Sequence, residues 1–329
     1  MMKRMAVFTA LLLLSAGFAW AGPMVPKDIG AGAKWFGHVN FEAIRSMKLV
    51  QDLKDKCPVH QQCQAMMGEL AKKLGMNPLE DVLGATLYSS HYGGDLGVVL
   101  VYVKKLDRER MVNLLREKHP DYKTSEYGSR LLYNWTLGHH GKNMDMTGTF
   151  ASDKLIVIGA DATQVKTALD VLDGKKPSLA KDAPLIKDIA KNALFASRGI
   201  DVPEEYRKTT KCPVLHNCKT ATAVWVEKGG QITGKYEFAT VSEETAKSFK
   251  AIVDGLMALG QLRHSGTPAV KKIMDGLKVE TKGASFTATF TTSTTDVEAA
   301  VKAVMEHKKV SPQGKKEHNK KEKCPAAKD

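Results

Sequence analysis

The pattern C-P-V-x-x-x-C occurs twice in the chain, as Cys57-Pro58-Val59-His60-Gln61-Gln62-Cys63 and as Cys212-Pro213-Val214-Leu215-His216-Asn217-Cys218. Each copy has one histidine inside the loop. Two unrelated loops rarely agree in spacing, proline and valine together, so the pair indicates an internal duplication. We therefore expect the remaining chain to be organised as two similar halves around these loops.

The elements predicted around the two loops recur in the same order. In the first half a strand at 35–39 and a helix precede the cysteine loop, and a hairpin around Gly93-Gly94 follows it. In the second half a strand at 194–198 precedes the loop, and a hairpin around Gly229-Gly230 follows. Each half then continues with a helix, a hairpin around one glycine (Gly128 or Gly283) and a capped closing helix. The predicted fold is α+β, with two pseudo-twofold related halves that each combine a mainly antiparallel sheet with packed helices.

Capping residues predict where several helices begin. Asn40, Asp107 and Asp161 each precede an apolar helical pattern, Gly75 is placed to end the helix predicted at 64–75, and Thr295 with Glu298 has capping-box spacing. A longer helix is predicted from Ser242. Its apolar side comprises Ala246, Phe249, Ile252, Val253, Leu256 and Leu259.

The N-terminus predicts export. Lys3 and Arg4 precede an apolar run at 6–18, and Ala19-Trp20-Ala21 has the small-x-small pattern of a signal-peptidase site before Gly22. We interpret residues 1–21 as a signal peptide and expect a periplasmic or extracellular protein. No later stretch is long and apolar enough to be a membrane-spanning helix.

The remaining boundaries follow from composition. We predict a first α+β repeat at 22–175, a linker at 176–192 that ends in a short helix, a second repeat at 193–307 and a disordered lysine-rich tail at 308–329. The formal charge is +13, of which the signal peptide carries +2 and the tail +5. The remaining charge is modest and dispersed, so a specific nucleic-acid face is not expected. The tail could contact an anionic surface or polymer.

The cysteines have several readings. In an exported protein we expect local disulfides, Cys57 with Cys63 and Cys212 with Cys218. Pairing between the two loops, a thiol-redox pair and a zinc site that includes the loop histidines are the alternatives, although the spacing differs from the usual redox and zinc motifs. The odd residue, Cys324 in the lysine-rich tail, is expected to be a free thiol or to form an intermolecular bond.

One further segment has metal-ligand chemistry. His139, His140, Met144 and Met146 lie close together, and imidazole with thioether groups suits copper in an exported protein. The reading that we favour is nevertheless an ordinary polar hairpin loop at 138–147 with incidental His and Met, and these four residues are only weak candidates for a metal site.

No hydrolase, phosphate-loop or dinucleotide motif is present in the sequence, so we expect neither a cofactor nor catalytic residues. The preferred hypothesis is a non-enzymatic exported protein, either a binding module or an envelope-structural module of unknown ligand. The alternative is a metal-handling (copper or zinc) or thiol-redox protein. A hydrolase with a site assembled from dispersed residues stays open.

Three segments, Trp35-Phe36-Gly37-His38-Val39-Asn40, Leu83-Gly84-Ala85-Thr86-Leu87-Tyr88 and Leu169-Asp170-Val171-Leu172-Asp173-Gly174-Lys175, together with the order of elements, resemble a family of uncharacterised exported proteins of planctomycete-type bacteria. The resemblance covers most of the chain after residue 21. It implies the duplicated α+β fold and export, and it assigns no catalytic residues.

Overall fold

The computed structural model describes residues 22–54, 58–93, 97–139, 142–210, 213–263 and 268–310. In chain order the elements are η2 (Pro26–Asp28), β1 (Trp35–Asn40), α2 (Phe41–Ser46), α3 (Lys48–Lys54), α4 (Pro58–Leu74), α5 (Pro78–Asp81), β2 (Val82–Ser89), β3 (Val98–Val103), α6 (Arg108–Lys118), β4 (Lys123–Tyr127), β5 (Arg130–His139), β6 (Lys142–Ser152), β7 (Leu155–Gly159), α7 (Ala162–Leu172), β8 (Phe195–Gly199), α8 (Glu204–Thr209), α9 (Pro213–His216), β9 (Cys218–Lys228), β10 (Gln231–Thr240), α10 (Glu243–Arg263), α11 (Pro268–Asp275), β11 (Leu277–Lys282), β12 (Ser285–Ser293) and α12 (Thr294–Val310).

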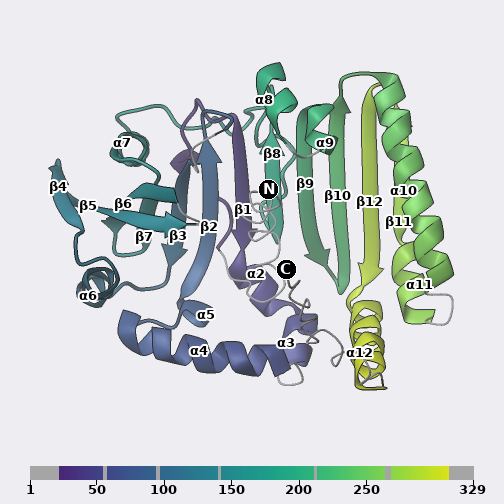
Figure 1. The fold of residues 1–329 in the computed structure, drawn as a ribbon, viewed down its shortest axis with the longest axis horizontal. Coiled ribbons are helices and arrows are strands. Elements are labelled where there is room, and N and C mark those ends of the chain that lie inside the picture. The colour runs from purple at the N-terminus through teal and green to yellow at the C-terminus, as the bar shows by residue number, and fades with distance from the viewer. Residues whose placement is uncertain are drawn as a thin grey trace, which may run out of the picture.

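The strands of the described chain form one twelve-stranded antiparallel sheet (Figure 1). Its order is β11-β12-β10-β9-β8-β1-β2-β3-β7-β6-β5-β4. The two halves of the chain meet at the β1–β8 pair, where Phe36 lies opposite Arg198 and His38 opposite Ala196. The α+β class is confirmed, and the two predicted sheets are joined into a single one.

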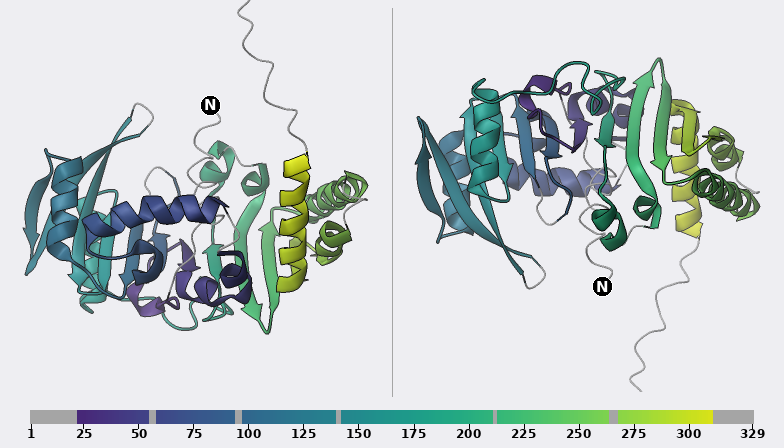
Figure 2. Two further views of the ribbon diagram at one scale, coloured as in Figure 1. Left: turned by 90° about the horizontal axis from the view of Figure 1, so that it is seen from below. Right: turned by 90° about the horizontal axis from the view of Figure 1, so that it is seen from above.

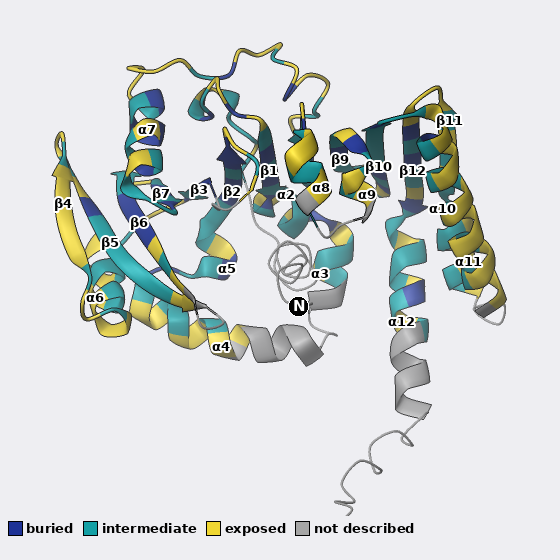
Figure 3. Ribbon diagram, turned by 45° about the horizontal axis from the view of Figure 1, so that its top comes forward, coloured by how far each residue is buried: buried dark blue, intermediate teal, exposed yellow. Residues whose placement is uncertain are grey.

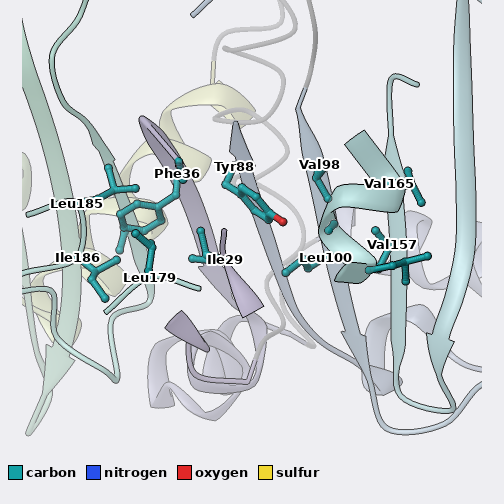
Figure 4. Packing of buried hydrophobic residues seen from close by; sticks show 14 of the residues in the cluster. Ile29, Phe36, Tyr88, Val98, Leu100, Val157, Val165, Leu179, Leu185 and Ile186 are labelled. Carbon is teal, nitrogen blue, oxygen red and sulfur yellow. The ribbon is translucent and has the colours of Figure 1, made fainter. Parts of the chain in front are cut away.

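One face of the sheet carries the largest buried cluster. Phe36 of β1 lies opposite Tyr88 of β2, which lies opposite Val98 of β3, and Leu100 of β3 lies opposite Val157 of β7. Val165 of α7 belongs to the same buried cluster (Figure 4). Successive side chains of a strand point to opposite faces, so these residues define what we call the first face. Helix α7 and the turn of η2 cover it.

The predicted linker also covers the first face. Leu179, Leu185 and Ile186 are buried in the same cluster, with Leu185 only 1% exposed. Residues 176–192 form turns and an isolated bridge rather than the short closing helix that we predicted. The hydrophobic side chains of this segment bury enough surface to fix it against the sheet without regular hydrogen bonding of its own.

The second face is covered mainly over the other half of the sheet. Phe286 and Ala288 of β12 are buried with Ala246 of α10, and a smaller cluster joins Met47, after α2, to Ile232 of β10. Helices α10 and α11 lie beside β11 and β12 at one end of the molecule, well away from α4 and α6 (Figure 2).

The two halves share part of their topology. From the central pair the order runs outward as β1-β2-β3-β7 and as β8-β9-β10-β12. The closing helices of the two halves differ in the face of the sheet that they cover. Helix α7 packs on the first face, whereas Val297 of α12 packs on the second. The hairpins at Gly128 and Gly283 both lie at an edge of the sheet, but β6 and β7 separate β5 from β3, whereas β12 pairs directly with β10. The duplication therefore stays a prediction.

Local signals placed most element ends correctly. The side chains of Asn40, Asp107 and Asp161 each accept a hydrogen bond from the backbone N–H three residues later. Gly229 and Gly230 have φ of 60° and 78°, as a tight two-residue hairpin turn between β9 and β10 requires. The predicted cap of the last helix is wrong: the hydroxyl of Ser293 accepts from the N–H of Asp296, so the cap lies two residues before Thr295 and the helix begins at Thr294.

Candidate functional site

Helix α10 carries an apolar surface that the described fold leaves open. Ile252, Leu256, Leu259 and Leu262 are 59%, 62%, 63% and 75% exposed. We call these four residues the α10 stripe. Figure 3 shows α10 as a largely exposed helix at the end of the molecule. Single exposed apolar residues are common on protein surfaces, but a row of four large aliphatic side chains on one helix indicates a contact surface.

The stripe arises because the apolar sector of α10 is wider than its contact with the sheet. Ala246, Phe249 and Val253 face the buried cluster of Phe286 and Ala288. Residues on the same helix face recur at intervals of three and four, so the stripe lies along the neighbouring side of the helix. The sequence pattern assigned Ile252, Leu256 and Leu259 to the same buried side as Phe249. The structure corrects that prediction, because all three are exposed.

The charges of α10 lie away from the stripe and are paired within the helix. The Nζ of Lys247 is 2.7 Å from a carboxylate oxygen of Glu243, and the Nζ of Lys250 is 2.6 Å from one of Asp254. Both pairs have the i, i+4 spacing that places side chains side by side. The stripe itself is uncharged.

A buried polar cluster lies on the first face between η2 and the sheet. His38 is 1% exposed, its Nδ1 lies 2.8 Å from the hydroxyl oxygen of Thr86, and its Nε2 lies 3.2 Å from the carbonyl oxygen of Gly22. A carbonyl only accepts, so Nε2 carries the hydrogen and Nδ1 accepts from Thr86 when the ring is neutral. Burial lowers the pKa of His38 to about 4, which keeps it neutral.

The second part of this cluster joins Tyr102 to Asp28. The hydroxyl of Tyr102 donates to the Asp28 carboxylate over 3.0 Å. Burial raises the pKa of both groups, although the tyrosine hydrogen bond partly counteracts the rise for Asp28. Perturbed titratable groups often mark active sites, but structural networks also perturb them. Here His38 and Tyr102 are each hydrogen-bonded to a residue of the segment 22–28, so the cluster attaches that segment to the sheet.

The cysteine loops are only partly described. Cys57, Cys212 and Cys324 lie outside the described residues. Cys63 lies in α4, which begins at Pro58, so the prediction of a loop up to Cys63 with a helix at 64–75 is wrong. Cys218 is buried at the start of β9, with its Sγ 3.0 Å from the carbonyl oxygen of Val214. Since each predicted disulfide includes a cysteine outside the described residues, both pairings stay predictions.

The His/Met segment belongs to a strand pair rather than to the polar loop that we expected at 138–147. Strands β5 and β6 pair as far as His139 and Lys142, with Leu137 opposite Met144 and Trp135 opposite Met146. Met146 is buried and Met144 is half-buried, while His140 lies outside the described residues. Within the described part of the chain no group of three or more His, Cys, Asp or Glu side chains could hold a metal ion. Copper binding by this segment stays an untested alternative.

No helix of the described residues is long and apolar enough to cross a membrane. Residues 1–21, which we predict to be a signal peptide, and most of the lysine-rich tail at 308–329 lie outside those residues.

Comparisons with known proteins add little to this picture. No family model and no curated protein matches the chain. Two solved structures, "Structure of crystal form I of TP0453" and "Structure of crystal form III of TP0453", are similar at TM-scores of 0.42 and 0.39 with 6% and 5% sequence identity. They cover 85% and 86% of this chain and 98% of their own chains. Likeness at this level carries no information about function.

Proposed function

We propose that the protein is a non-enzymatic exported protein, a binding or envelope-structural module, that acts by contact through the α10 stripe. The observation that carries the proposal is the row of four aliphatic side chains, each more than half exposed, on a helix whose other apolar side is already packed. A row of this kind lowers solubility unless a partner covers it.

The free energy available at the stripe is appreciable. Burying one Leu or Ile side chain completely contributes about 1.5–3 kcal/mol. With exposed fractions of 59–75% for the four residues, covering the stripe contributes roughly 4–8 kcal/mol before the costs of association. Because association itself costs at least about 4 kcal/mol, the stripe supports a weak interaction, and a tighter one needs apolar surface buried on the partner as well.

Export is part of the proposal. The carbonyl of Gly22, the residue that follows the predicted cleavage site, accepts a hydrogen bond from His38 and so attaches the chain to the sheet from that residue on. We expect N-terminal sequencing of the exported protein to begin at Gly22. A protein that retains Ala19-Trp20-Ala21 would contradict this assignment.

The proposed contact is tested by photocrosslinking in the native host. A photoreactive amino acid at Leu259 is expected to give covalent adducts of higher mass. The same residue at Lys247, an exposed position on a different side of α10, is the matched control. Absence of adducts from position 259, or equal adducts from both positions, would refute contact through the stripe.

A further inference from the structure

We infer that the partner of the α10 stripe is a second copy of this chain, with the two α10 helices packed antiparallel. This inference rests on the proposed function, since it names the occupant of the same surface. Helix α10 lies at the outer end of the molecule beside β11, so a second molecule can approach it without meeting α4, α6 or α7 (Figures 1 and 2).

The spacing of the stripe is that of a helix-pairing seam. Ile252 and Leu259 are seven residues apart, as are Gly255 and Leu262, and the four stripe positions are separated by steps of four, three and three residues. Such a repeat keeps side chains along one seam when two helices pack side by side. Residues 252–262 span about 15 Å along the helix axis.

The seam is complementary to itself only when the second helix runs in the opposite direction. In the antiparallel register centred near residue 257, Ile252 lies opposite Leu262 of the second copy, and Leu259 lies opposite Gly255. A Cβ atom added at Gly255 would meet nothing within 4 Å, so this position offers open space for an incoming leucine. In this register Leu259 meets a glycine, while Ile252 and Leu262 make an aliphatic contact at the ends of the seam.

The distribution of charge on α10 favours a protein, rather than a lipid surface, as the partner of the stripe. The lysines of α10 at 247 and 250 are each paired with an acidic side chain of the same helix. Helices that lie on anionic membranes typically carry an excess of Lys and Arg on the polar face, opposite an apolar face of Trp, Phe or Leu, and α10 has no such excess of basic residues. The stripe is purely aliphatic, and charge-poor apolar patches are typical of the cores of protein interfaces.

The area of the stripe limits the strength of the dimer. Its four side chains supply roughly 200–300 Å² of apolar surface per copy. A standard stable interface needs about 800 Å² per partner, so neighbouring side chains of α10 must contribute and the complex belongs to the weak class. We therefore expect a concentration-dependent dimer with a Kd of about 10 µM.

The test is sedimentation equilibrium of the purified full-length protein between about 1 and 100 µM. The average mass is expected to rise from one chain toward two. Leu259→Glu is expected to weaken association at least tenfold, and Met66→Glu is the matched control, since Met66 is an apolar residue of α4 that is 60% exposed. A wild-type protein that stays monomeric throughout, or a Met66→Glu variant that weakens association equally, would overturn the inference.

Two further measurements test the antiparallel orientation of the helices and the choice between a protein and a lipid partner. Oxidation of a variant with Ile252→Cys and Leu262→Cys is expected to join positions 252 and 262 of different chains, as read by peptide mapping. A link only between identical positions would overturn the antiparallel arrangement. Flotation with vesicles of phosphatidylcholine and phosphatidylglycerol is expected to show no dependence on Leu259. If the wild-type protein is monomeric and binds vesicles, and Leu259→Glu abolishes this binding, the dimer is overturned. Contact through the stripe would then still be supported, with a lipid surface as the partner.

Discussion

The buried His38 makes the stability of the protein depend on pH in the mildly acidic range. Its pKa falls from an ordinary value near 6.5 to about 4 in the folded chain, because burial disfavours the charged ring. The unfolded chain therefore binds the proton more readily. The contribution to stability is complete above about pH 6.5 and is lost as the pH falls toward 4. Linkage gives a loss of about 2.5 kcal/mol between neutral pH and about pH 4.5.

Geometry explains why protonation is unfavourable. The neutral ring donates from Nε2 to the carbonyl of Gly22 and accepts at Nδ1 from Thr86. A protonated ring donates at both nitrogens, so the Thr86 hydroxyl has to reverse its role in a site with 1% exposure for His38. Asp28 acts in the opposite direction, since its raised pKa makes protonation at low pH favour the folded chain. The wild-type profile alone thus understates the effect of His38.

The assay is urea unfolding at about pH 7.5, 5.5 and 4.5 for the wild type and for His38→Gln, whose amide can still donate to Gly22. The variant is expected to be less stable than the wild type at neutral pH and to lose about 2.5 kcal/mol less on acidification to about pH 4.5. Parallel pH profiles for the two proteins would refute this account of His38. An NMR titration of the wild-type ring with a midpoint near 6.5 would do the same.

Three substitutions check other parts of the structure by chemical denaturation. Leu256→Gln on the exposed stripe is expected to change the free energy of unfolding by less than about 0.5 kcal/mol, whereas Phe286→Ala, on the packed side of the same helix contact, is expected to cost about 3–5 kcal/mol. Equal losses would contradict the division of α10 into an open and a packed side. Asp161→Ala removes the cap of α7 and is expected to lower the free energy of unfolding by about 1 kcal/mol. An unchanged free energy of unfolding would show that this cap does not stabilise the helix. Gly97→Ala is expected to destabilise strongly, because φ is 72° and the new Cβ would lie 2.3 Å from the carbonyl oxygen of Tyr88; a neutral result would show that this turn is wrongly placed.

Features that depend on a few neighbouring residues were predictable from the sequence. The caps at Asn40, Asp107 and Asp161 and the hairpin glycines at 229–230 act over two or three residues, so their chemistry is visible in any short window. The last helix shows the limit of such windows, because Ser293 and Thr295 both suit a cap and only the register of β12 decides between them.

The sheet order and the α10 stripe were not predictable in the same way. Pairing β1 with β8 is a long-range choice that no local pattern encodes. The stripe was hidden because periodicity identifies apolar positions without saying how much surface the sheet can cover. Phe249 and Ile252 look alike in a helical pattern, yet one contacts Phe286 and the other is 59% exposed. An apolar sector much wider than a single packing face is the signal that could have revealed it.

The β1–β8 pair has a consequence for the order in which the chain is made. β1 is synthesised early and soon finds β2 on one side, but its other edge pairs only with Phe195–Gly199 of β8. Until that strand has emerged, β1 presents unpaired backbone N–H and C=O groups together with the apolar side chain of Phe36, the combination that favours pairing with the wrong chain. A nascent or partly translocated chain that stops before residue 195 is therefore an open-edged intermediate. Truncations that remove β8 are expected to aggregate even though they retain most of the largest hydrophobic cluster.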